Sequence, residues 1–250
     1  MSGSALTEAR EQCHHAVQIN TRLARGFTQE QADDSHTSLS WNASAGALIG
    51  QPAGGFRLGI RIADLTLVLY GAEGGEPSSF ALDGRTLDDA MTWLEGRLVE
   101  AGLDPSPLRK PLHFTLEPHA LQEGGTFRQK GIETELAELA KWYGDAALCL
   151  GKVSSPVRCW PHHFDLATQV TVEKGSIGAG MSPGDASYAQ PYFYLSPWPY
   201  PAAEELPPLE LGHWHTAGWV GAVLTADEVI AAADQQQAVS LFLNQLHPNA

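Results

Sequence analysis

The chain has 250 residues, 43% of them hydrophobic and 8% aromatic, which is enough to bury a substantial core and argues against a wholly disordered chain. Its 15 basic and 29 acidic residues give a net charge of −14, and no cluster of Lys or Arg stands out, which argues against nucleic acid and anionic membranes as partners. Three cysteines without CxxC spacing, no signal-peptide pattern and no apolar run near the roughly 20 residues of a membrane span favour a cytoplasmic protein.

Hydrophobic periodicity in the first half predicts two helices with short strands between them. A phase shift in the alternation at Ala63-Asp64 indicates a hairpin turn rather than one long strand. Thr86, followed by Asp89, is typical of a capped helix start. In chain order we expect a helix over 6–23, a loop over 28–37, a strand over 39–49, a hairpin over 57–70, a turn over 71–77, a strand over 79–82 and a helix from 86 to 102.

The second half repeats this order of elements after a proline-rich irregular segment. In chain order we expect a helix over 132–150, strands over 157–172, 176–181, 192–196 and 213–224, and two short helices that follow capping residues at Thr225 and Asp234. The sequence therefore predicts an α+β fold with two pseudo-repeated antiparallel strand clusters, each followed by a helix and linked by a helix. We expect a single unit over 1–250 with halves 1–130 and 131–250.

Gly180-Met-Ser182-Pro-Gly184 matches the GxSxG pattern of a hydrolase nucleophile elbow. Such an elbow needs a helix after the serine and an N–H on the next residue, but that residue is Pro183 and a strand is predicted to follow. We interpret Ser182 as a turn residue between two strands.

Histidines are concentrated in two short segments of the second half. On a strand alternate residues share a face, so His163 would point with Asp165, and His213 with His215. Two such pairs on adjacent strands could ligate a divalent transition metal such as zinc, iron, manganese or nickel. We expect the strand that begins at His213 to lie beside the strand of His163 and Asp165, with these side chains facing one cavity that Tyr192 or Tyr194 also borders. The alternative is that these histidines form hydrogen bonds within half-buried, tryptophan-rich strands, because no HExxH or cupin-like pattern is present.

Aromatic residues are concentrated in the same region, together with the acidic turn residue Asp185. They could line a pocket for a sugar, an aromatic ring or an aliphatic ligand, although core packing is the ordinary explanation of such a cluster. The ligand-binding residues that we expect are Trp160, Tyr192, Tyr194, Trp198 and Trp214, with Phe193, Tyr200 and Trp219 nearby.

Other features of the sequence carry less functional information. We interpret His14 and His15 as surface or packing residues of the first helix, and His113 and His119 as solvent-facing loop residues. No GxGxxG or GxxxxGK[ST] pattern is present, so nucleotide binding is not predicted.

The stretch LGKVSSPV at 150–157 and the following WPHHFDLA at 160–167 resemble a family of bacterial proteins that carry a domain of unknown function. The resemblance extends through Phe193, Trp198-Pro199 and Phe242-Leu243, and more loosely back over 57–84. It implies a bacterial protein of that family and no activity. In the broader family the position of Pro161-His162-His163 can be occupied by other residues, which implies that a metal site would belong to a subgroup or not exist.

Three hypotheses follow from the residues. The preferred one is a small-molecule-binding protein with a histidine and aromatic pocket in the C-terminal half, between about Trp160 and Trp219. The second is a metal-dependent hydrolase or oxidoreductase that uses the same histidines. The third is an interaction module whose aromatic patch packs against a partner or a second copy of the chain.

Overall fold

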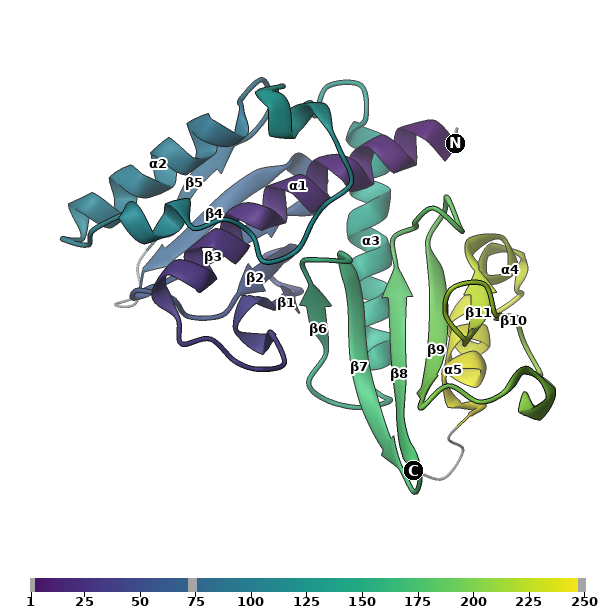
Figure 1. The fold of residues 1–250 in the computed structure, drawn as a ribbon. Coiled ribbons are helices and arrows are strands. Elements are labelled where there is room, and N and C mark those ends of the chain that lie inside the picture. The colour runs from purple at the N-terminus through teal and green to yellow at the C-terminus, as the bar shows by residue number, and fades with distance from the viewer. Residues whose placement is uncertain (1–2, 72–75, 247–250) are drawn as a thin grey trace. The chain divides into compact units, whose positions relative to one another are not determined.

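The computed structural model describes residues 3–71 and 76–246 (Figure 1). These residues form an α+β fold in which five α-helices accompany eleven strands that pair in an antiparallel manner, as the sequence predicts. The chain divides into two compact units. The first is Met1–Lys141 with Cys159–Phe164, and the second is Trp142–Arg158 with Asp165–Ala250.

The first unit is built on a sheet whose strands run in the order β6-β1-β2-β3-β4-β5. Helix α1 packs against this sheet and against α2 (Figure 1), and its residues Ala9, Cys13, Ala16 and Leu23 are completely buried. The elements are α1 (Gly3–Phe27), β1 (Leu39–Asn42), β2 (Ala47–Gly50), β3 (Phe56–Arg61), β4 (Thr66–Gly71), β5 (Ser78–Ala81), α2 (Leu87–Glu100) and β6 (Arg158–Trp160), with 3-10 turns at η1 (Ser35–Thr37), η2 (Ile62–Asp64), η3 (Ser106–Arg109) and η4 (Ala120–Glu123).

The predicted hairpin over 57–70 is confirmed, with η2 at the phase shift and Leu65 in the left-handed region at φ 47°. The helix start at Thr86 is also confirmed, because Thr86 and Asp89 form a capping box. The single strand predicted over 39–49 is wrong. It is a hairpin of β1 and β2, because the Asn42 side chain accepts from the Ala45 N–H at 3.0 Å and turns the chain there. The predicted turn over 71–77 lies largely outside the described residues.

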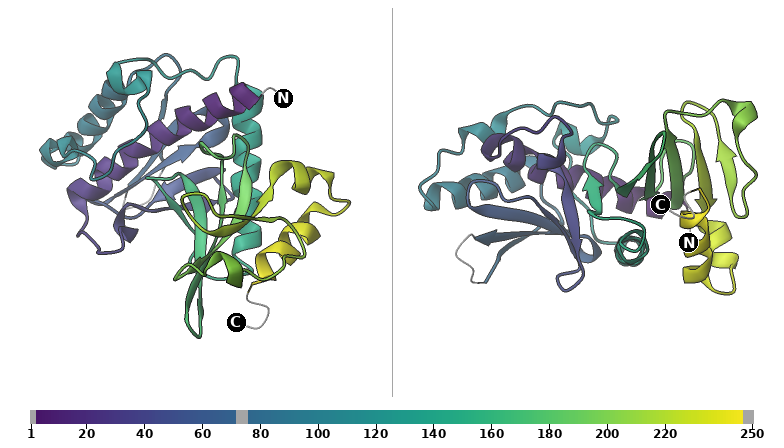
Figure 2. Two further views of the ribbon diagram at one scale, coloured as in Figure 1. Left: turned by 45° about the vertical axis from the view of Figure 1, so that its right-hand side comes forward. Right: turned by 90° about the horizontal axis from the view of Figure 1, so that it is seen from below.

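The second unit contains a sheet in the order β10-β11-β9-β8-β7. Helices α4 and α5 lie on one face of it (Figure 2). The boundary between the two units falls within α3, whose residues from Trp142 onward belong to the second unit. The elements are α3 (Glu133–Leu150), β7 (Asp165–Val172), β8 (Gly175–Ser182), β9 (Tyr192–Trp198), β10 (His213–His215), β11 (Gly221–Thr225), α4 (Ala226–Ala231) and α5 (Gln235–Asn244), with η5 (Ala203–Glu205) between β9 and β10.

Two long strands predicted in the second half are each two strands. The strand expected over 157–172 is interrupted by a turn at 161–164, where the Phe164 N–H bonds to the Trp160 carbonyl and Phe164 has φ 58°. The strand expected over 213–224 folds back on itself between β10 and β11, and Gly218 has φ 88° in the connection. The predicted caps at Thr225 and Asp234 are confirmed.

The topology does not show the predicted pseudo-repeat. In the first unit the strands β1 to β5 are neighbours in chain order, whereas the second sheet places β11 between β9 and β10. The repeat relation between the halves 1–130 and 131–250 stays a prediction. Within residues 3–71 and 76–246, none of the helices is both long enough and apolar enough to traverse a bilayer.

Candidate functional site

One face of the second unit's sheet carries most of its polar aromatic side chains. Residues paired across an antiparallel ladder share a face. Tyr194 pairs with Gly180 on β8 and with Val223 on β11, and Val223 pairs with His213 on β10. Strand alternation then places Tyr192 and His215 on the same face. The predictions that Tyr192 points with Tyr194, and His213 with His215, are confirmed.

The opposite face is apolar and covered. Phe193 and Leu195 alternate with the two tyrosines and are buried, and the Phe193 ring lies 6.2 Å from that of Trp142 on α3. Helix α5 packs against β9. Hydrophobic packing on this face therefore fixes the direction in which Tyr192 and Tyr194 project.

The loop between β8 and β9 brings Tyr188 onto the polar face. Its hydroxyl oxygen lies 3.0 Å from His213 Nε2 and 3.2 Å from His215 Nδ1. The second nitrogen of His215, Nε2, lies 2.8 Å from the Ala217 carbonyl, which can only accept, so this nitrogen carries the proton. In the neutral ring Nδ1 then accepts from the Tyr188 hydroxyl, and the Tyr188 oxygen accepts from His213. One phenol thus fixes the proton positions of two imidazoles.

Asp185 holds this loop in place. Its Oδ1 accepts from the backbone N–H groups of Ser187 and Tyr188 at 2.7 and 2.9 Å, and its Oδ2 accepts from the Tyr192 hydroxyl at 2.6 Å. Ser182, 6% exposed, also hydrogen-bonds Tyr192 and accepts from the Gly184 N–H at 3.2 Å. The chain continues from β8 into the antiparallel strand β9, so the expected strand-to-strand turn is confirmed and no nucleophile elbow forms.

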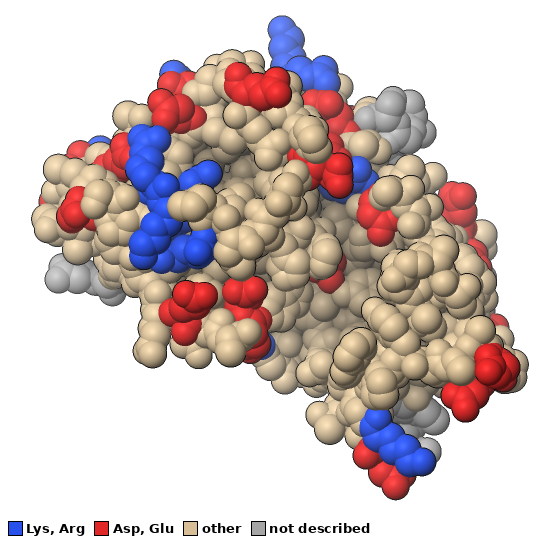
Figure 3. Space-filling view, viewed as in Figure 1, with Lys and Arg blue, Asp and Glu red and all other residues tan. Residues whose placement is uncertain are grey.

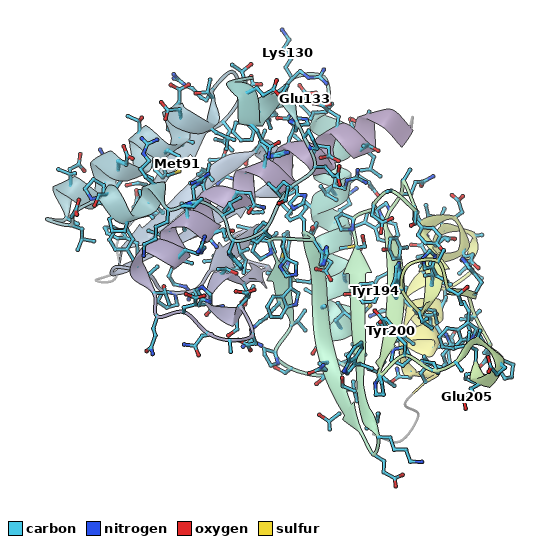
Figure 4. The ribbon with its side chains drawn as sticks, in the orientation of Figure 1. Met91, Lys130, Glu133, Tyr194, Tyr200 and Glu205 are labelled. Carbon is cyan, nitrogen blue, oxygen red and sulfur yellow. The ribbon has the colours of Figure 1, made fainter. Side chains whose placement is uncertain are left out.

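Two glycines allow aromatic rings to lie flat on the sheet. A Cβ at Gly180 would lie 2.4 Å from Tyr194 Cζ, because the Tyr194 ring crosses β8 to donate to Asp165 Oδ2 at 2.5 Å. A Cβ at Gly221 would lie 2.2 Å from Trp219 Cζ3, and the Trp219 ring stacks on His215 with centroids 4.6 Å apart. Figure 4 shows Tyr194 on the sheet and Tyr200 on the segment after β9.

Burial is the main electrostatic influence on the tyrosines. It raises the pKa of Tyr188, with smaller contributions from the carboxylates Asp185 and Glu228. It also raises the pKa values of Tyr192 and Tyr194, and the hydrogen-bonded carboxylates Asp185 and Asp165 add to the effect. All three phenols are therefore protonated donors at neutral pH.

The predicted metal ligands do not come together as expected. His163 lies in the turn before β7 and belongs to the first unit, so it does not share a strand face with Asp165. The expectation that the His213 strand lies beside the Asp165 strand is wrong, because β11, β9 and β8 separate them. Four strand spacings of about 4.8 Å place these backbones roughly 19 Å apart, too far for a shared ion. Among the described residues, no group of three or more His, Cys, Asp or Glu is placed to hold a metal.

Three of the predicted ligand-binding residues lie away from Tyr188 and the two histidines that it contacts. Trp160 ends β6 in the first unit, with its ring 6.2 Å from His162. Trp198 is 64% exposed at the end of β9, in an edge contact with Tyr200. Trp214 alternates with the two histidines of β10, so it points to the other face, where its Nε1 donates to the Pro207 carbonyl at 2.8 Å.

Sequence reasoning missed Tyr188. Tyr188 stands in a polar loop, outside any strand pattern, and only closure of that loop brings it to the histidines. Gly180 on β8 was an available signal, since glycine inside a strand often marks close approach of another group. The structure also contains cavities of about 560 and 550 Å³ in the first unit, outside the region that the sequence singled out.

A comparison of the chain with protein-family models, curated proteins and solved structures found no match in any of the three. The resemblance carried by 150–157 and 160–167 therefore stays a prediction, and the functional argument depends on the geometry of the chain itself.

Proposed function

We propose that this protein binds a small molecule at the Tyr188 cluster, which we define as Tyr188, Tyr192, Tyr194, His213, His215 and Trp219. The observation that carries the proposal is the Tyr188 hydroxyl held between two imidazoles, in direct contact with a row of aromatic rings. Oriented polar groups beside flat apolar surfaces are the usual components of a small-molecule site.

The exposure of the cluster indicates what such a ligand would contact. Tyr192 is 4% exposed and acts as support, whereas His213 is exposed and Tyr188, His215 and Trp219 are half-buried. A ligand would therefore stack on the rings of Trp219 and His215 and exchange hydrogen bonds with His213 and Tyr188. This favours a sugar or an aromatic ring with polar substituents. The location that we propose, the cytoplasm, depends on the composition of the sequence.

The metal-dependent alternative keeps two candidate ligands, His213 and His215, and would need further ligands from solvent or substrate. In that alternative the ion would compete with the Tyr188 hydroxyl for the imidazole nitrogens. Metal-dependent chemistry stays a prediction, and so does an interaction role for the aromatic patch.

The test uses protein with 13C-labelled histidine rings, titrated with phenol, indole, glucose and, separately, Zn²⁺. We expect at least one ring-bearing probe to shift the His213 and His215 ring resonances in a saturable way. Tyr188→Ala should weaken this binding at least roughly tenfold, because a hydrogen-bonding group and a ring surface are both lost.

Tyr200→Ala is the matched control, since Tyr200 is an exposed tyrosine of the same unit outside the cluster. It should leave the titration unchanged. The proposal fails if the organic probes shift neither histidine, or if Tyr188→Ala and Tyr200→Ala behave alike. Saturable shifts with Zn²⁺ alone would favour the metal-dependent alternative instead.

A further inference from the structure

The first unit contains a cavity of about 560 Å³, a size typical of small-molecule sites. It lies among α1, the start of α2, the segment after η3, and η4. Helix α1 contributes His15, Gln18, Ile19 and Arg22, whose three- and four-residue spacing places them along one face of the helix. Met91 of α2, labelled in Figure 4, is part of the apolar wall.

His15 is a buried polar group at one end of this row. The residue is 2% exposed, its ring stacks on that of His119 with centroids 4.7 Å apart, and within the described residues its ring nitrogens make no side-chain hydrogen bond. The interpretation of His15 as an ordinary surface or packing residue is therefore incomplete. Burial lowers its pKa to about 4, with His119 and His14 adding to the effect, so the ring is neutral at pH 7. A neutral imidazole offers one donor and one acceptor, and buried groups of this kind are normally satisfied.

Arg22 is a half-buried cation at the other end of the row. Its Nη1 donates to the Lys110 carbonyl at 3.0 Å, and burial lowers its pKa, with the cations Arg109 and Arg25 adding to the effect. Throughout the described residues, no carboxylate lies within ion-pair distance of Arg22 or Arg25. Arg109 differs, because Asp88 and Glu95 bind it at 3.0 and 2.6 Å.

Folding thus creates a basic patch that is not visible along the sequence. Arg22 and Arg25 at the end of α1 both contact Lys110, 88 and 85 positions away along the chain, and Arg109 lies next to it; Figure 3 shows Lys and Arg side chains gathered over this part of the molecule. In a chain with a net charge of −14, such a patch beside a cavity favours an anion there.

We propose that this cavity binds an amphipathic organic anion, whose acidic group accepts from Arg22 and whose other polar end exchanges a hydrogen bond with His15. The two residues are seven positions apart, so they are separated by about 10.5 Å along the helix, roughly the length of an eight-carbon chain. Ile19 and Met91 contact the apolar middle of the ligand. The acidic group is a carboxylate or a phosphate monoester, since a guanidinium binds both.

The test measures binding of four probes by calorimetry: 8-hydroxyoctanoate, octanoate, octyl phosphate and neutral octane-1,8-diol. We expect 8-hydroxyoctanoate to bind at least tenfold more tightly than the diol, and Arg22→Gln to remove this difference. His15→Leu should remove the preference for 8-hydroxyoctanoate over octanoate and leave octanoate affinity nearly unchanged. The ratio of octyl phosphate to octanoate affinity identifies which acidic group the site prefers.

Arg97→Gln is the matched control, because Arg97 pairs with Glu100 on α2 and does not line the cavity. Backbone amide shifts of the unsubstituted protein give a second readout that does not depend on any variant folding, and they should change along 15–22 on α1. The proposal is overturned if the diol binds as well as the anions, if the shifts lie elsewhere, or if Arg22→Gln and Arg97→Gln have equal effects.

Discussion

At the scale of single residues, the Tyr188 hydroxyl is the group on which the candidate site depends. It is the common hydrogen-bond partner of His213 and His215, and its loop is fixed independently by Asp185. Removal of the hydroxyl would take away the hydrogen-bond partner of one nitrogen in each imidazole, which would then bind water. The loop itself would stay in place, because Asp185 holds it.

We therefore expect Tyr188→Phe to lower the free energy of unfolding by about 1 kcal/mol, the usual net value of a hydrogen bond at a partly buried position. It should also shift the ring resonances of both His213 and His215. Urea denaturation and histidine NMR measure the two effects. The exposed hydroxyl of Tyr200 makes no hydrogen bond to any residue over 3–71 and 76–246, so Tyr200→Phe should change neither; equal effects of the two substitutions would contradict the network.

At the scale of elements, strand β8 has glycines at two positions on its polar face, and only one of them lies under an aromatic ring. Gly180 lies under the Tyr194 ring, whereas a Cβ at Gly178 would have its nearest neighbour, the Ser196 carbonyl oxygen, at 3.7 Å. The same substitution at two positions of one strand therefore meets different surroundings.

Gly180→Ala should destabilise the second unit by about 1 to 3 kcal/mol, because the added methyl group displaces the Tyr194 ring from Asp165. Gly178→Ala should be neutral or stabilising by up to about 1 kcal/mol, since alanine loses less backbone entropy than glycine. Denaturant unfolding of both variants compares them directly. Similar values for the two would show that Tyr194 does not need the space above Gly180.

At the scale of the whole molecule, the histidines of the first unit link its stability to pH. Burial is the largest cause that lowers the pKa of His14, and it lowers those of His15 and His162 to about 4. In the unfolded chain these groups titrate near 6.5. Between pH 6.5 and 4 the unfolded state therefore binds more protons than the folded state, so stability is lost as the pH falls through this window.

We expect the free energy of unfolding of the first unit to fall by up to about 1.4 kcal/mol per pH unit for each of His15 and His162 between pH 6.5 and 4, and His14 to contribute in the same direction. His15→Gln should reduce this slope, since glutamine does not titrate. Denaturant unfolding at several pH values gives the slopes, with the exposed Lys152→Gln as control. An unchanged slope in His15→Gln would mean that His15 has the same pKa in the folded and unfolded states, which would contradict the prediction.

The sequence by itself determined the local elements with strong signals. The amphipathic pattern of α1, the capping residues Thr86, Thr225 and Asp234, and the phase shift at Ala63-Asp64 all act over a few residues, so they can be recognised without a partner. The shared face of His213 and His215 follows from strand alternation alone. The two breaks at 161–164 and near Gly218 were missed, because a residue with positive φ inside an apolar stretch gives only a weak local signal.

Only the tertiary structure decided which segments meet. Strand order is set by long-range pairing, so β11 separates His213 from β9, and the predicted pairing of the β10 and β7 strands failed. Tyr188 reaches the histidines through loop closure, and the basic patch forms because α1 packs against η3. Contacts of this kind join residues 25 or more positions apart in the sequence. The free energy that selects them comes from burying apolar surface over the whole fold. Hydrophobic periodicity within a short window carries no information about these distant partners.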